Sequence, residues 1–266
     1  MVRYDSTPIA KSDRIKRLVD HLYAKMPEIE ASRAELITES YKATEGQPVV
    51  MRKAHAFYHI LKHLPIIIRP EELIVGSTTI APRGCQTYPE FSYEWLEAEF
   101  ETVETRSADP FYISDETKKR LLAADAYWKG KTTSELATSY MAPATLRALK
   151  HNFCTPGNYF YNGVGHVTVQ YDTVLTIGLH GVKEKVKKEM ETCHFGDADY
   201  STKMRFLESI IISCDAVITY ANRYAVLAEE MAAKETDAKR KQELLNISEI
   251  CRKVPEFPAG DCRLSS

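Results

Sequence analysis

The residues with the clearest potential for chemistry lie in the stretch GNYFYNGVGHV, residues 157–167 of this 266-residue chain. Three aromatic residues, three glycines, two asparagines and one histidine occupy nine of these eleven positions. Glycine lets backbone come close to a ligand or to other backbone, and aromatic side chains exclude water. His166 could donate a hydrogen bond to a bound hydroxyl or exchange a proton with it near neutral pH, and Asn158 and Asn162 add amide groups. Periodicity alone favours a core histidine over a ligand-binding one.

A second set of residues invites a metal-site interpretation. His55, His59 and His63 recur every four residues on a predicted helix, so they share one face and two of them could ligate a metal. No glutamate lies between them as in a metalloprotease helix, and we predict a packing or surface role without a metal. The glycines of residues 157–167 do not match the dinucleotide fingerprint, and no Walker, nucleophile-elbow or kinase motif occurs in the sequence.

The composition is that of an ordinary globular protein, with 44% hydrophobic and 27% charged residues and a formal net charge of -2. This balance predicts neither a nucleic-acid nor a membrane partner, because phosphate binding needs a concentrated basic surface. The basic run at residues 181–190 alternates lysine with glutamate and predicts a solvated helix face. Six cysteines without paired spacing, in a chain with no signal peptide or long apolar run, predict reduced thiols in the cytoplasm.

Helices are expected to make up most of the chain, because apolar residues recur at helical spacing along it. Helix starts are expected at Ser12, at Ser114 and at Thr132, where Glu135 completes a capping box. The expected helical segments are 12–27, 30–46, 49–64, 91–100, 114–122, a short one from 132, 171–190, 200–234 and 236–254.

Two short apolar runs and one long stripe complete the pattern. Residues 66–68 and 73–75 are too short for helices and are expected to be extended, whereas residues 82–89 are rich in turn formers and are expected to be irregular. One apolar stripe is expected along residues 200–234. Its members are Phe206, Ile210, Cys214, Val217, Ile218, Ala221 and Leu227.

Five long segments resemble, in order and spacing, the N-terminal part of the glycyl radical enzymes, and within that family the cobalamin-independent glycerol and propane-1,2-diol dehydratases. They are ELITESYKATEGQPVVMRKAHAF, ELIVGSTTIAPRGCQTYPEFS, GKTTSELATSYM, GNYFYNGVGHVTVQYDTVL and FLESIIISCDAVITYANRYA. The resemblance covers residues 13–259 and implies that residues 1–259 are the N-terminal part of a pyruvate formate-lyase-like domain. The fold it implies is mainly α, the helical N-terminal layer of the family's α/β barrel, with few short strands.

The resemblance also implies a reaction. In the family a glycyl radical near the C-terminus generates a thiyl radical at a central cysteine, which abstracts hydrogen from C1 of a diol, and water then leaves from C2. The radical is installed by an activating enzyme that uses S-adenosylmethionine, and no cofactor or metal is bound. The catalytic cysteine, its glutamate and the radical glycine lie beyond the region that this chain covers, so no catalytic residue is assigned here.

Substrate-binding residues are implied by the same resemblance. In the diol dehydratases the residue matching His166 bonds the substrate hydroxyls, and the residue matching Asn158 lies close by. The related choline lyases place an acidic residue where His166 stands, which suits a cationic substrate, whereas a histidine suits an uncharged diol. The substrate expected here is propane-1,2-diol or glycerol, converted to an aldehyde, and a fragment of another glycyl radical lyase such as a choline lyase is the alternative.

The family's chains are several-fold longer, and residues 260–266 depart from its pattern. We therefore expect a truncated or frameshifted product, or a partial gene model, that lacks the barrel centre and the radical domain and is inactive alone. A catalytically dead helical relic that serves as an interaction protein is the alternative. The resemblance further implies a homodimer when full length, a radical S-adenosylmethionine activase as partner, no nucleic-acid or membrane partner, and a cytoplasmic location that includes bacterial microcompartments.

Overall fold

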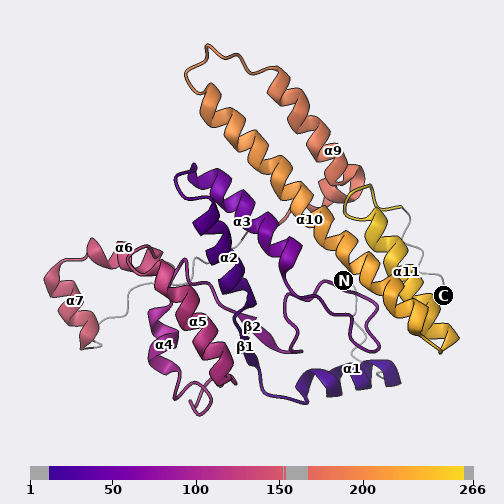
Figure 1. Cartoon of the computed structure of the whole chain (residues 1–266), viewed down its shortest axis with the longest axis horizontal. Coiled ribbons are helices and arrows are strands. Elements are labelled where there is room, and N and C mark those ends of the chain that lie inside the picture. Colours follow the sequence, from indigo (N-terminus) through magenta and orange to yellow (C-terminus); the bar gives the residue numbers. More distant parts are fainter. Residues whose placement is uncertain (1–11, 152, 154–166, 261–266) are drawn as a thin grey trace, which may run out of the picture.

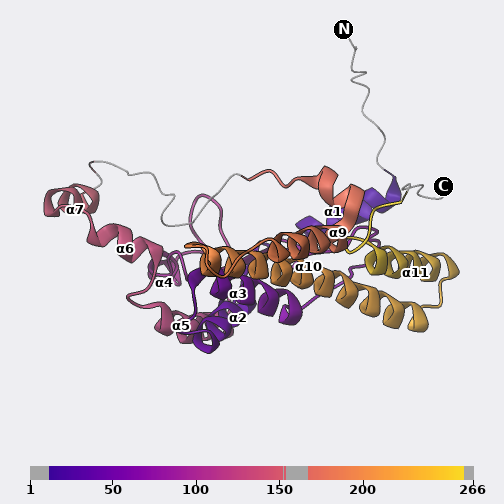
Figure 2. The same ribbon diagram turned by 90° about the horizontal axis from the view of Figure 1, so that it is seen from above.

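The computed structural model describes residues 12–151, 153 and 167–260. Helices dominate these residues, and α6 and α7 extend away from the others in both views (Figures 1 and 2). The elements are α1 (Asp13–Tyr23), β1 (Glu28–Glu30), α2 (Ser32–Ala43), α3 (Val49–His63), β2 (Gly84–Gln86), α4 (Glu94–Glu99), α5 (Asp115–Trp128), α6 (Thr133–Ser139), α7 (Pro143–Lys150), α9 (Tyr171–Glu191), α10 (Tyr200–Lys234) and α11 (Ala238–Lys253).

Helix starts follow the local capping chemistry. Ser12 and Ser114 accept hydrogen bonds from the backbone three residues on, and they begin α1 and α5 as predicted. Thr132 and Glu135 form the predicted capping box of α6. Asp237 caps α11 through the backbone N–H of Arg240. These side chains satisfy N–H groups that the first turn of each helix leaves without a partner.

The two strands do not coincide with the two short apolar runs, residues 66–68 and 73–75, that were expected to be extended. β1 and β2 pair in parallel, with Ile29 opposite Cys85. Residues 66–68 and 73–75 form no strand, and β2 occupies part of residues 82–89, which we predicted to be irregular. Each strand has three residues, so the pairing depends on contacts between distant segments rather than on strand propensity.

One half of the core lies between α2, α3 and α5. Ile29, Ala34 and Leu121 are almost fully buried in one cluster, and Ile60 and Trp128 belong to the adjoining cluster. Figure 1 shows α2 and α3 side by side between α5 and α10. Apolar burial of this kind is the main stabilising contribution to a helical layer.

The long helix α10 organises the other half, where it packs against α3, α9 and α11. Ala228 and Ala232 are completely or almost completely buried, and they allow α11 to approach closely. The predicted stripe is wrong in part, because Phe206 is 55% exposed, whereas Leu207 and Tyr224 are buried. By length and composition alone, α10 could cross a membrane. This is weak evidence, because core helices of globular proteins meet the same criteria.

Hydrogen bonds from α10 reach several neighbours. Arg223 donates to the carbonyl oxygens of Leu61 and Leu64, both at 2.7 Å, and so caps the C-terminal end of α3. Tyr224 donates its hydroxyl to the carbonyl oxygen of Ser77 at 2.9 Å. Lys183 of α9 pairs with Asp215 of α10. Positions along α10 therefore hold three separate segments of the chain.

Candidate functional site

The predicted substrate-binding residues His166 and Asn158 lie outside the described residues, as does most of the stretch 157–167. The structure does describe the elements on either side of this stretch. On one side lies α7, which begins at Pro143, because proline is well tolerated in the first turn of a helix. No helix was predicted for residues 143–150. On the other side Val167 is exposed and α9 begins at Tyr171.

A break at Gly178 divides α9 close to this stretch. Residues 171–190 were predicted to be helical, and they are, but Gly178 has φ 67° and ψ 170°, a conformation open essentially to glycine alone. The short first part of α9, residues 171–177, therefore runs in a direction of its own.

Residues 255–259, which follow α11, form backbone hydrogen bonds with the residues on both sides of this break. The backbone N–H groups of Leu179 and His180 donate to the carbonyl oxygens of Pro255 and Glu256 at 2.9 and 2.8 Å. In the other direction, the N–H of Ala259 donates to the carbonyl oxygen of Leu175 at 3.0 Å. These bonds satisfy backbone groups that the break would leave unpaired, and they fix residues 171–177 against residues 255–259.

Two of the three histidines of α3 contact other side chains of the chain. His59 Nε2 lies 2.9 Å from a Glu39 carboxylate oxygen, and the rings of His59 and His63 are 4.6 Å apart. Among the described residues no group of three or more histidine, cysteine or acidic side chains is arranged to hold a metal. Partial burial, followed by the neighbouring His59, lowers the pKa of His63. His59 and His63 thus contact other side chains of the chain, and the packing or surface role of the three histidines stays a prediction.

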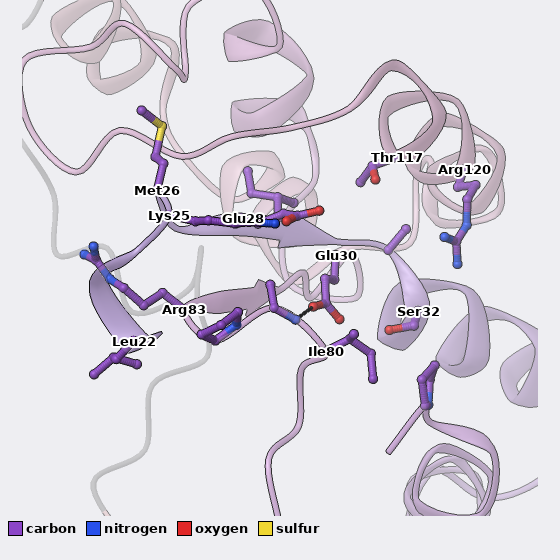
Figure 3. Close-up of a pocket in the computed structure, with 15 residues that line it drawn as sticks. Leu22, Lys25, Met26, Glu28, Glu30, Ser32, Ile80, Arg83, Thr117 and Arg120 are labelled. Atoms are coloured by element: carbon purple, nitrogen blue, oxygen red, sulfur yellow. Dashed lines mark hydrogen bonds between the residues drawn. The ribbon is translucent and has the colours of Figure 1, made fainter. Parts of the chain in front are cut away.

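A cavity of about 390 Å³ lies beside β1 (Figure 3). Arg83 and Arg120 lie toward its opposite ends, and Glu30 points between them (Figure 3). Two of the charged side chains here already have partners: Glu30 accepts hydrogen bonds from Ala81 N–H at 2.7 Å and Gln86 Nε2 at 3.2 Å, and Arg120 pairs with Glu35. This cavity is held together by its own polar contacts.

A second cavity, of about 290 Å³, lies between β2, α4 and α5, and we call it the aromatic cavity. It has no counterpart among the residues singled out from the sequence. Its walls include Tyr88, Tyr93, Trp95, Leu96, Phe111 and Leu121. Asp125 of α5 also lines it and is only 5% exposed. The signal that could have found Asp125 is its position four residues after Leu121 and three before Trp128, on the buried face of the helix.

The four cysteines among the described residues are free thiols: Cys85, Cys193, Cys214 and Cys251. Burial raises the pKa of the Cys214 and Cys251 thiols, which disfavours the reactive thiolate. At Cys214 the neighbouring Asp215 adds to this shift and outweighs Lys183, which opposes it.

Comparison with models of protein families shows to which family this chain belongs. The family model described as pyruvate formate lyase-like matches residues 7–263. The chain belongs to the pyruvate formate lyase-like family. This membership confirms the resemblance to glycyl radical enzymes.

Solved structures give the same relationship in three dimensions. A structure from Roseburia inulinivorans, concerned with 1,2-propanediol dehydration, is 89% identical with a TM-score of 0.91 and covers 97% of this chain and 31% of its own. The glycerol-bound B12-independent glycerol dehydratase from Clostridium butyricum is 47% identical with a TM-score of 0.90, over 96% of this chain and 33% of its own. The predicted fold, a mainly helical N-terminal portion of the glycyl radical enzymes, is confirmed.

Two more distant relatives are named for sulfonated substrates. An isethionate sulfite-lyase from Oleidesulfovibrio alaskensis is 35% identical over 257 residues, covering 93% of this chain and 31% of the relative. A (2S)-3-sulfopropanediol dehydratase from Klebsiella oxytoca is 32% identical over 252 residues, covering 91% and 30%. The chain thus spans about 31% of the length of the curated relatives it matches.

Proposed function

We propose that this chain forms the N-terminal part of a glycyl radical diol dehydratase, which eliminates water from propane-1,2-diol or glycerol to give an aldehyde. The observation that carries the proposal is the 89% identity, over 97% of the chain, to the Roseburia protein concerned with 1,2-propanediol dehydration. Identity falls to 47% for the glycerol dehydratase and to 35% for the isethionate sulfite-lyase. This order favours a diol over a sulfonate as substrate.

The contribution of this chain is to bind and orient the diol. His166 would donate a hydrogen bond to the leaving C2 hydroxyl, and Asn158 would hold the second hydroxyl. The broken helix α9 supports this role, because its first part is fixed by residues 255–259 only a few residues after His166. A glycyl radical elsewhere in the enzyme would initiate the hydrogen abstraction.

None of the six cysteines lies in the family's catalytic cysteine motif, so the radical steps belong to residues that this sequence does not hold. The 266-residue chain alone therefore does not turn over a diol. The remaining parts of the proposal are a homodimer, a radical S-adenosylmethionine activase as partner, and a cytoplasmic location that includes a microcompartment.

The test joins residues 1–259 to the remaining two thirds of the Roseburia enzyme in one chain. After anaerobic activation, the chimera should convert propane-1,2-diol to propionaldehyde, while the 266-residue chain treated in the same way should give none. Formation of the radical, measured by electron paramagnetic resonance, shows that the chimera is assembled. A chimera that carries the radical yet cleaves choline and leaves both diols untouched would contradict the proposal.

A further inference from the structure

The aromatic cavity contains a buried acid without a partner. The carboxylate of Asp125 accepts no hydrogen bond and forms no ion pair with any residue that the structure describes, although the residue is only 5% exposed. A buried carboxylate is costly unless something compensates its charge. Thr87, which also lines the cavity, has a buried hydroxyl oxygen without a partner among the same residues. Two polar groups at this cavity thus have unused bonding capacity.

The charges around Asp125 are mostly negative. Glu94 and Glu97 of the neighbouring helix α4 are close enough to act on it. Arg106, the basic residue in the cavity wall, is already engaged by the Glu99 carboxylate at 2.7 Å and by the Asp109 carbonyl oxygen. Lys129 acts on Glu97 from the end of α5. The field at Asp125 therefore favours a cation over an anion.

The walls suit a cation with an apolar body. Tyr88 and Trp95 are each 49% exposed, and Tyr93 and Leu96 are buried deeper. Aromatic faces attract cations, and two of these rings already have one: Arg33 lies over Tyr88 at 3.7 Å from the ring centroid, and Arg106 lies over Phe111 at 5.6 Å. The ammonium group of a ligand is therefore placed on Asp125, with only its apolar body against the rings. A cavity of about 150 Å³ is enough for benzene, so about 290 Å³ has room for an aromatic ring with a short side chain.

We propose that the aromatic cavity binds a small organic ammonium ion, with its apolar body between Tyr88, Trp95 and Phe111 and its ammonium group on the Asp125 carboxylate. This site uses neither His166 nor Asn158, so it goes beyond diol dehydration and its failure would leave that proposal standing. The ligand neutralises Asp125, and Thr87 provides a hydroxyl for a second polar group.

Burial, with Glu97 and Glu94 adding to it, raises the pKa of Asp125 to about 7. The ionised form that pairs with an ammonium group thus increases from about one tenth at pH 6 to about nine tenths at pH 8. An alkylammonium ion keeps its charge over this range. Tyr93 and Cys85, which also line the cavity, have pKa values raised by burial and stay neutral.

The experiment measures binding of 2-phenylethylammonium to the 266-residue chain by isothermal titration calorimetry, with tryptophan fluorescence, to which Trp95 and Trp128 both contribute, as a second measurement. We expect saturable binding that tightens about five- to tenfold between pH 6 and pH 8. The neutral isostere 2-phenylethanol should bind at least tenfold more weakly at pH 8. No binding of the ammonium ion at millimolar concentration, or equal binding of the alcohol, overturns the proposal.

Two variants locate the site. Asp125→Asn removes the charge at nearly constant size. This variant should bind the ammonium ion at least tenfold more weakly at pH 8, and its affinity should not depend on pH. Asp115→Asn changes the same chemical group at the exposed start of the same helix and should bind like the unaltered chain. Because Asp125→Asn removes a buried charge, it should fold at least as well, and unchanged affinity in this variant also overturns the proposal.

Discussion

Gly178 lies directly against Phe257, so that a Cβ atom added at Gly178 would come within 2.7 Å of the Phe257 Cα. No real Cβ tolerates such contact with backbone, and the main chain on both sides is fixed by hydrogen bonds. The glycine therefore allows the two segments to meet, and the direction of the first part of α9 depends on it.

Gly178→Ala should destabilise this junction. The change combines the cost of a glycine-only backbone conformation, about 1–3 kcal/mol, with a clash against the backbone of residues 256 and 257. We expect the free energy of unfolding to fall by at least about 2 kcal/mol in urea titrations, and amide exchange to accelerate at residues 171–177. Gly196→Ala, where a Cβ would meet nothing within 4 Å, is the control and should change stability by less than about 0.5 kcal/mol.

His166→Ala, made in the chimera, should lower kcat for propane-1,2-diol about 100-fold, because hydrogen bonding and proton transfer to the leaving hydroxyl contribute at least that much. The radical signal should be unchanged, which separates the loss from failed activation. His194→Ala, at an exposed histidine between α9 and α10, is the matched control. Full turnover by the His166 variant would mean that this side chain only packs.

Thr38→Val measures how much one hydrogen bond between α2 and α5 contributes to the stability of the fold. The Thr38 hydroxyl accepts a hydrogen bond from the Trp128 indole Nε1 at 2.8 Å in a buried setting. Valine keeps the shape but leaves the indole N–H without its acceptor, so we expect a loss of about 1–3 kcal/mol in the free energy of unfolding. Thr102→Val, at an exposed turn, should lie within about 0.5 kcal/mol of the unaltered chain, and equal effects of both would contradict this reading.

Asp125 should make stability depend on pH. Its folded-state pKa of about 7 lies above its ordinary value of 3.8, so the folded state binds the proton more tightly. The contribution of Asp125 to the stability of the unaltered chain should therefore fall as the pH rises from about 4 to about 7. Asp125→Asn removes this dependence, and its advantage should grow from near zero at pH 4 to about 4 kcal/mol above pH 7.

Urea unfolding of both proteins between pH 4 and pH 8 measures this difference. Acids with lowered pKa values, such as Glu135 and Glu243, contribute in the opposite direction but equally in both proteins, so they cancel. A difference that stays constant across the range would show that Asp125 titrates normally in the fold.

The parts of the fold that the sequence predicted well are those that local chemistry determines. Ser12, Ser114 and the Thr132–Glu135 pair mark helix starts because a side chain and a backbone N–H three residues away suffice to form the cap. The pairing of β1 with β2 escaped prediction because it joins residues more than 50 positions apart through three residues each. The break in α9 escaped it because its partner lies at residues 255–259.

The candidate site divides in the same way. His166 and Asn158 came from a resemblance over long segments, since periodicity alone favoured a core histidine, and both remain predictions. The aromatic cavity could not be predicted, because Asp125 on a helix says nothing of Trp95 and Phe111, which the tertiary fold brings to it. Phe206 was placed in the core by its spacing, but no neighbouring element covers it in the described structure.

The partners of α10 have a consequence for how this chain can vary in length. Asp215, Arg223 and Tyr224 hold α9, the end of α3 and the segment at Ser77, so their spacing along the helix must match the positions of three separate segments. One inserted residue in the middle of α10 would turn everything after it by about 100° and shift it by about 1.5 Å. Insertions are therefore tolerable at the turns between helices, whereas an insertion within α10 would separate residues that must contact these segments at the same time.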